Sequence, residues 1–328
     1  MARHTLALVI FTVGCSHSPM QQEPPPDLAM AEAPTDMAMA VVTPQPDAAP
    51  FEYTRPPGVA TCYSSLSQND PATTNFFNAL LATDYASRAA ANHALAEAEN
   101  AHPNEEEFAL LNGLANLWRI VEPAPGEEAD KFGQILAALR AKNELERAFQ
   151  LCPTDYRIPA WLGPLDVTFG RQGGGQGFID QGLMVLQTGI DHYPAFVLFS
   201  KVLIYADRPP TDPDFLMAVD AVDQSFVACG DLTTTHDPAC MNTPHAPHNI
   251  EGSVTHLGDA YAKAGRRDDA LMTYAGAMRS STYNSWPFRA FLEDHIANID
   301  TRIAAYAAGQ EPEAAWNSKI QCAICHQQ

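Results

Sequence analysis

Basic residues are scarce in this chain. Its 19 Lys and Arg stand against 39 Asp and Glu, which gives a formal net charge of −20. Phosphate backbones and anionic lipid surfaces repel a protein of this charge, so the composition argues against nucleic acid or an anionic membrane surface as a partner. The same acidity favours solubility and cationic partners.

Strand patterns and the common enzyme motifs are missing as well. No segment alternates apolar and polar residues in the way a half-buried strand does. We find no G-x-S-x-G elbow, no H-E-x-x-H and no paired carboxylates. The glycine-rich residues 170–177 follow no strand and precede no Lys-Ser/Thr, which excludes a phosphate-binding loop and indicates a turn between helices. We expect a protein that is not an enzyme.

Long apolar runs are also absent, apart from residues 5–13, which are too few to span a bilayer. Arg3 and His4 precede this run, and it leads into Thr-Val-Gly-Cys15, which resembles the lipobox of bacterial lipoproteins. The resemblance implies that residues 1–15 are a lipoprotein signal peptide with lipidation at Cys15; an ordinary secretory peptide is the alternative. Ser16, rather than aspartate, favours the outer membrane, on its periplasmic or surface side. The chain is exported under either interpretation.

Residues 16–58 carry ten of the chain's 26 prolines, dispersed among Ala, Met, Asp and Gln. Proline removes amide donors and fixes φ, so neither a helix nor a ladder can run through this segment. Its scattered apolar residues cannot offset the entropy of ordering. We expect a disordered linker that holds the folded part away from the lipid anchor.

Residues 59–308 show helical spacing of apolar positions. The pattern predicts helices within residues 75–101, over 105–120 with Asn104 as N-cap, and over 127–152. Prolines and glycines separate these segments, as helix breakers do. The predicted fold class is therefore all-α.

One segment carries a repeat pattern: Val254, Leu257, Gly258 and Tyr261, followed by Ala270, Tyr274 and Ala277. It resembles the tetratricopeptide family, in which small residues let two helices approach and large ones fill the seam. Gly265 would lie in the turn between the helices. Looser copies occur at Asn112-Gly113, at Ala141, Leu145, Ala148 and Pro153, at Leu162-Gly163, and at Leu186, Gly189 and Pro194.

The resemblance implies an α-solenoid of helical hairpins over residues 59–308, with a groove for a protein ligand. A plain helical domain with one fortuitous match is the alternative.

Seven cysteines are present. With Cys15 assigned to lipid and two cysteines to the C-terminal segment, four remain, and an exported protein with an even remainder is expected to form disulfides. We expect Cys229–Cys240 as a local pair and Cys62–Cys152 as the second, although four cysteines allow three connectivities.

Residues 309–328 are predicted to form a C-terminal helix from about Glu313, with Trp316 and Ile320 on the face that docks. It ends in Cys322-Ala-Ile-Cys325-His326, which resembles the attachment motif of c-type cytochromes. The resemblance implies a covalent haem c with Cys322 and Cys325 as thioether anchors and His326 as proximal iron ligand. A distal ligand would come from Met241, His245 or His248, in an irregular loop; His256 is expected to be structural.

Several functions stay open. The first is an exported, lipid-anchored scaffold that carries one haem c and serves electron transfer with a redox partner protein or another cytochrome. The alternative is a haem-free adaptor for protein assembly, in which Cys322 and Cys325 form a disulfide or join His245 and His248 in a zinc site. A haem enzyme such as a peroxidase is a third reading, for which no acid–base residues are identified.

Overall fold

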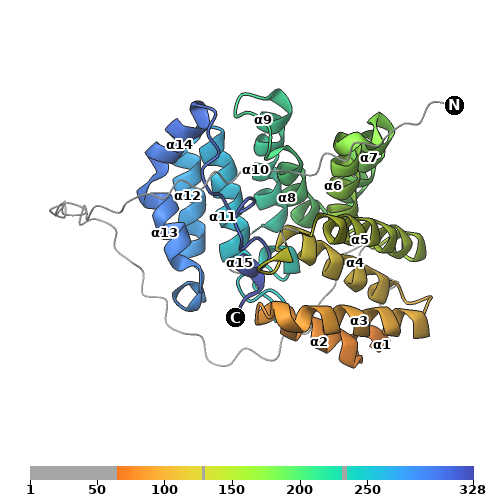
Figure 1. Ribbon diagram of the computed structural model, residues 1–328. Coiled ribbons are helices and arrows are strands. Elements are labelled where there is room, and N and C mark those ends of the chain that lie inside the picture. The colour runs from red at the N-terminus through yellow and green to blue at the C-terminus, as the bar shows by residue number, and fades with distance from the viewer. Residues whose placement is uncertain (1–64, 128–129, 231–234) are drawn as a thin grey trace. The chain divides into compact units, whose positions relative to one another are not determined.

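The computed structural model describes residues 65–127, 130–230 and 235–328 (Figure 1). All of them belong to one unit, Thr54–Gln328. The expected signal peptide with Cys15, the expected linker and Cys62 lie outside the described residues.

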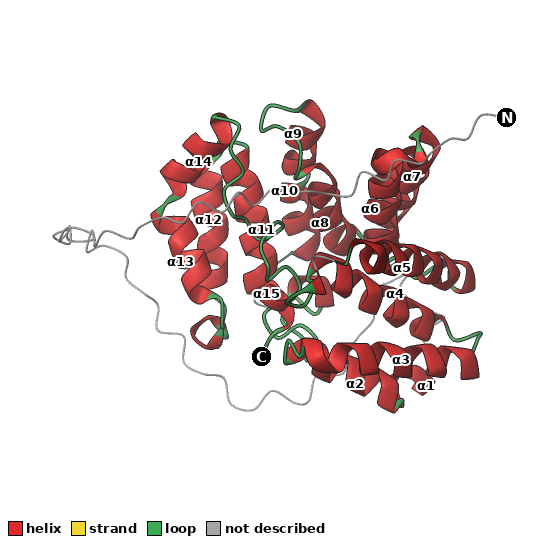
Figure 2. Cartoon of the chain, viewed as in Figure 1, coloured by secondary structure: helices red, strands yellow, loops and turns green. Residues whose placement is uncertain are grey.

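Throughout the part of the chain that the structure describes, the regular elements are helices, and the sole β-pairing is an isolated bridge between Thr243 and Ala246 (Figure 2). The all-α prediction is confirmed. None of the described helices is both long and apolar enough to cross a membrane. The α-helices are α1 (Ser65–Asn69), α2 (Pro71–Leu81), α3 (Tyr85–Ala101), α4 (Glu106–Val121), α5 (Lys131–Leu151), α6 (Pro159–Phe169), α7 (Gln176–His192), α8 (Pro194–Tyr205), α9 (Pro213–Asp220), α10 (Val222–Cys229), α11 (Asn249–Lys263), α12 (Arg267–Met278), α13 (Arg289–Ala297), α14 (Ile299–Ala307) and α15 (Ala323–His326).

Consecutive helices pair as hairpins: α2 with α3, α4 with α5, α6 with α7, and α11 with α12. Several starts are set by side-chain caps, since Asp70 Oδ1 accepts from Ala72 N at 2.7 Å and Asp84 Oδ1 from Ala86 N at 3.0 Å. Such caps satisfy amide donors that the first turn leaves unpaired.

Two predicted helix starts are wrong. The N-cap of α4 is Glu105 rather than Asn104, and it makes no side-chain cap bond. Helix α5 begins at Lys131, not at residue 127, because Asp130 caps it through Gly133 N at 2.9 Å. Glu127 is engaged elsewhere: its carboxylate accepts from Ala124 N and pairs with arginines of α3 and α4.

The hairpin of α11 and α12 has the packing that its sequence predicts. A Cβ at Gly258 would overlap the ring of Tyr274, so only glycine lets α12 lie this close. Gly265 has a φ of 77° in the turn, a backbone conformation that glycine adopts without strain. The glycine-rich residues after α6 form a short π-helical turn, η2 (Gly170–Gly174), that leads into α7.

The predicted helix from about Glu313 is wrong in extent. Residues 313–322 are irregular backbone and turns, and only α15 is helical in this segment. Local bonds divert the backbone: Ala315 N donates to the buried Asp259 at 2.8 Å, and Ala314 N donates to Asn317 Oδ1 at 2.7 Å. The docking face itself is as expected, because Trp316, Ile320 and Ile324 all pack on the core around α11.

Candidate functional site

The C-terminal C-x-x-C-H segment lies inside the fold rather than at its edge. Helix α15 packs against both α11 and α2, helices far apart in the sequence (Figure 1). Between the two cysteines, Ala323 is 2 % exposed and Ile324 is fully buried. The segment therefore connects the first helices of the chain with the later ones.

Hydrogen bonds to several elements hold the backbone of the segment and of the residues that follow it. Gln328 N donates to Leu81 O at 3.0 Å, and Ala323 N donates to Glu122 Oε1 at 3.3 Å. On the other side, His248 N donates to Cys325 O at 3.0 Å and Trp286 Nε1 to Ile324 O at 2.9 Å. Because each bond reaches a different element, the backbone of α15 is fixed from both sides.

The two thiols contact different parts of the core. Cys322 packs against the cluster of α2, α3 and α4, whereas Cys325 packs against the cluster that contains α11 and α12. At Gly252 of α11, a Cβ would overlap Cys325 Sγ and lie 3.0 Å from Ile324 O. Glycine at this position is thus what lets α15 approach α11.

Both thiols are half-buried, and their surroundings raise the pKa of each. Burial raises the pKa of Cys322 well above its ordinary value, and the charge of Glu122 adds to this effect. Burial, with the nearby Glu251, raises the pKa of Cys325 to about 12. Since the thiolate is the form that attacks and that binds metals, this environment disfavours thiol chemistry in the folded state.

His326 has a defined tautomer. Its Nδ1 lies 2.5 Å from His245 O, and because a carbonyl only accepts, Nδ1 carries the proton. Burial lowers the pKa of the imidazole, which favours the neutral ring. Its Nε2 therefore keeps the lone pair, as in a histidine that binds a metal through that atom.

The predicted distal ligands lie beside the segment to different degrees. The ring of His245 stacks on Phe77 at 3.8 Å between centroids, and burial lowers its pKa. His248 is buried, with Nδ1 3.7 Å from Glu251 Oε1. Met241 is fixed by its carbonyl, which accepts from Asn249 Nδ2 at 3.1 Å. The structure thus brings the backbones at positions 245 and 248 to the segment, but gathers no metal-ligand set there.

Metal-ligating atoms do meet elsewhere. Within the described ranges, the only group of three or more His, Cys, Asp or Glu ligand atoms within 4.8 Å of one another is Glu106, Glu107 and Asp155. Arg157 pairs with two of these residues, Glu107 and Asp155. The four zinc ligands expected from the sequence do not form such a group.

Haem c requires two thiols on one accessible side of a porphyrin and an imidazole facing the iron. The tautomer of His326 fits this need. The thiols do not, because Cys322 and Cys325 face different clusters and the residues between them are buried. In this packing the segment does not fit a haem.

The disulfide Cys229–Cys240 is present, as predicted. It joins the end of α10 to the short helix η3 (Pro238–Cys240), where the histidine-bearing loop begins. Cys152 is disulfide-bonded, while its predicted partner Cys62 lies outside the described residues. His256 is structural as expected: it is buried against Phe199, and burial lowers its pKa to about 4.

Sequence reasoning missed the residues that receive the segment, namely Glu122, Glu251, Gly252 and Trp286. One signal was readable, since Gly252 interrupts an otherwise good amphipathic helix near its start. Comparisons with family models, with curated proteins and with solved structures returned no match to this chain.

Proposed function

We propose that this chain is a non-enzymatic adaptor of the bacterial cell envelope, a tetratricopeptide-like scaffold anchored by lipid at Cys15. In this proposal the C-x-x-C-H segment has a structural role: it packs between α2 and α11 and so holds the early and late helices together. One observation carries this proposal: the two half-buried thiols contact different clusters of the core, and the pKa of each is raised. The lipobox-like start of the sequence supports the location.

The finer architecture is part of the proposal. The helical hairpins α4–α5, α6–α7 and α11–α12 fall at the positions where the repeat pattern recurs in the sequence. Repeats of this kind stack into a solenoid in which each contacts its neighbours, and they present extended surfaces for binding. We infer such an array, with a protein ligand.

Electron transfer through a covalent haem c is the second candidate, together with a redox partner protein. The neutral His326, with Nδ1 donating to a carbonyl, favours it. Haem attachment would require α15 to leave its present contacts, because its two thiols pack against different clusters there.

One experiment separates the two candidates. The full-length protein is exported in a host that matures c-type cytochromes, and the pyridine haemochrome spectrum is recorded after acid–acetone extraction. We expect no haem band, and two thiols that react with a thiol reagent much more slowly before denaturation than after it. A band that survives extraction and is lost in Cys322→Ala would overturn the adaptor proposal and establish the cytochrome.

A further inference from the structure

Exposed apolar side chains gather on α5 and α7. Ten large apolar residues are exposed in the described ranges, and four of them lie on these two helices. Apolar surface gathered in one place on a soluble protein commonly marks an interaction site. The four are Phe132 at 70 % exposure, Leu139 at 43 %, Phe178 at 37 % and Met184 at 65 %.

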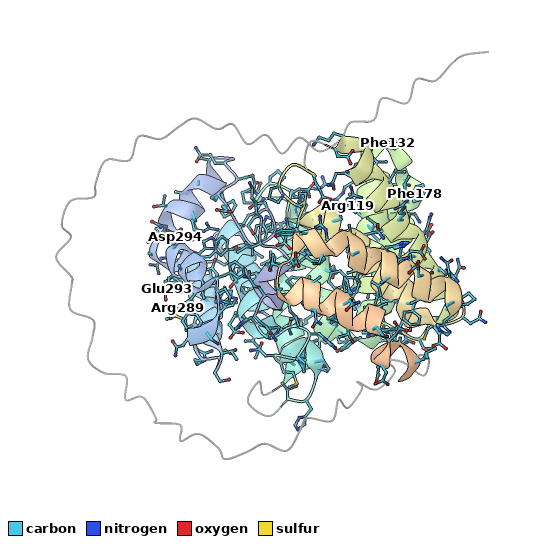
Figure 3. The ribbon with its side chains drawn as sticks, turned by 60° about the horizontal axis from the view of Figure 1, so that its bottom comes forward. Arg119, Phe132, Phe178, Arg289, Glu293 and Asp294 are labelled. Atoms are coloured by element: carbon cyan, nitrogen blue, oxygen red, sulfur yellow. A yellow bond between two sulfur atoms is a disulfide. The ribbon has the colours of Figure 1, made fainter. Side chains whose placement is uncertain are left out.

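The spacing of these residues forms a stripe along each helix. Phe132, Leu139 and Glu146 recur at intervals of seven on α5, which places them on one face. Lys142 Nζ lies 5.4 Å from the centroid of the Phe178 ring, so α7 begins beside the middle of α5. In Figure 3, Phe132 and Phe178 lie at the same edge of the molecule, on α5 and α7.

A cavity of about 480 Å³ lies between the same helices. Phe149 of α5, Leu162 of α6 and Val185 of α7 give it an apolar lining, and Met184 stands at its edge. Residues 146–150 of α5 and residues 180–185 of α7 both line it. We call the surface made by the four exposed apolar residues and this cavity the α5–α7 groove.

The groove is acidic at the cavity. Glu146 and Asp180 both line it. Glu146 is already paired with the ammonium of Lys142, which also lies 3.0 Å from the buried Asp166, so Asp180 is the carboxylate left to meet a cation. Asp180 is exposed and accepts only a neutral amide donor, Gln176 Nε2, at 2.8 Å. An occupant with positive charge next to apolar side chains complements these groups.

We propose that the α5–α7 groove binds a cationic amphipathic helix of a partner protein, with an apolar side chain in the cavity and Lys or Arg beside Asp180. An amphipathic helix binds by laying its apolar face on an apolar hollow of this kind. The inference rests on the proposed adaptor function, since it names the ligand class of that scaffold.

The test uses the full exported chain and a fluorescent Leu/Lys amphipathic helical peptide, followed by anisotropy. Met184→Lys should weaken binding by about tenfold, which is ~1.4 kcal/mol. Met272→Lys is the matched control, because Met272 lies on α12 at 66 % exposure and the charge change is identical. Asp180→Asn should weaken binding less and reduce its dependence on salt.

Other outcomes overturn the inference. If the wild type and Met184→Lys bind the peptide equally, the peptide is attracted only by the net charge of the protein. If a Leu/Glu peptide binds as tightly as the Leu/Lys peptide, charge plays no part in binding. If no peptide binds, the groove is not a peptide site. If the protein is a dimer that Met184→Lys dissociates, the groove binds a second copy of the chain instead. A haem band in the earlier experiment leaves these results unaffected, so the two failures are distinguishable.

Discussion

The hairpins α11–α12 and α6–α7 both depend on glycine for close helix packing, but they differ in how much of each helix is buried by the rest of the chain. In each, glycine permits the helices to cross closely: Gly258 lies under the Tyr274 ring, and Gly163 and Gly182 face each other's backbones. Yet from Glu251 to Lys263 every residue of α11 except Ser253 is buried, whereas α7 buries only Gly182, Val185, Leu186 and Gly189.

The difference lies in polar groups rather than apolar ones. Helix α11 buries Glu251, Asp259 and Lys263, and each finds partners from later parts of the chain. Buried charges are stable only when paired and hydrogen-bonded, so these residues require the cover that α14 and the C-terminal segment provide. Helix α7 buries no charge and can leave one side open.

The largest expected effect comes from Asp259, the polar centre of the covered hairpin. It accepts from Tyr274 Oη at 2.6 Å, His295 Nδ1 at 2.7 Å and Ala315 N at 2.8 Å, and it pairs with Arg302. Asp259→Asn should lower the free energy of unfolding by about 3–5 kcal/mol, because the buried Arg302 loses its counter-charge. Urea unfolding measures this; Asp300→Asn, which breaks an exposed pair with Arg267, is the control and should cost under ~1 kcal/mol.

The same residue predicts a pH dependence. Its partners His295 and Arg302 hold the pKa of Asp259 below its usual range despite burial. The stability it contributes is therefore present above the unfolded pKa and is lost as pH falls through the lower folded pKa. Acid unfolding of the wild type should steepen below about pH 4, and that steepening should be absent in Asp259→Asn; an unchanged acid limb would contradict the assignment.

The hairpin α4–α5 differs from α11–α12, because it buries the carboxyl group of Glu106 without a hydrogen-bond donor. Neither oxygen of Glu106 has a hydrogen-bond partner, and burial with the charges of Glu107 and Asp155 raises its pKa to about 9. Folding at neutral pH must then protonate it, so stability falls as pH rises from the unfolded pKa to the folded one. Glu106→Gln should stabilise the protein at pH 8 by on the order of 2 kcal/mol and leave stability at pH 4 unchanged. Melting curves at both pH values test it; destabilisation at pH 8 would refute the neutral-acid interpretation.

Gly252 tests the cover of α11 directly. A methyl group there meets Cys325 and the backbone of α15, so Gly252→Ala should cost about 1–3 kcal/mol. It should also speed alkylation of Cys325 in the folded protein. Gly276→Ala on α12 is the control, since the nearest atom to its Cβ is 3.8 Å away, and it should be neutral or slightly stabilising. Equal alkylation rates in the two variants would show that α15 does not depend on this contact.

The open hairpin should show the smallest effect on stability. Met184→Lys changes an exposed side chain with no polar partner to lose, so the unfolding free energy should stay within about 0.5 kcal/mol of the wild type. Thermal melting measures it. A large loss would mean that Met184 is part of the core and would remove the ground for a free groove.

Local patterns predicted what is local. Helical spacing predicted the helices, and Gly265 predicted the turn between α11 and α12. The short separation of Cys229 and Cys240 predicted their disulfide. The position of the C-x-x-C-H segment could not be predicted, since it depends on contacts such as Ala323 with Glu122 that no periodicity encodes. The predicted C-terminal helix failed for the same reason: a long-range bond from Ala315 to Asp259 outweighs local helix preference.

The contacts of α15 also set an order of assembly. Each hairpin can form as soon as its two helices have left the ribosome, but the bonds from Gln328 N to Leu81 O and from Ala323 N to Glu122 Oε1 form only after residues 323–328 are made. Closing a loop of about 200 residues costs only ~2 kcal/mol more than closing one of about 20, so equilibrium stability hardly registers the distance. Folding speed does, because long-range contacts form late. During synthesis the chain therefore passes through a stage in which helices are formed while the inner faces of α2, α4 and α11 are still uncovered and open to chaperones.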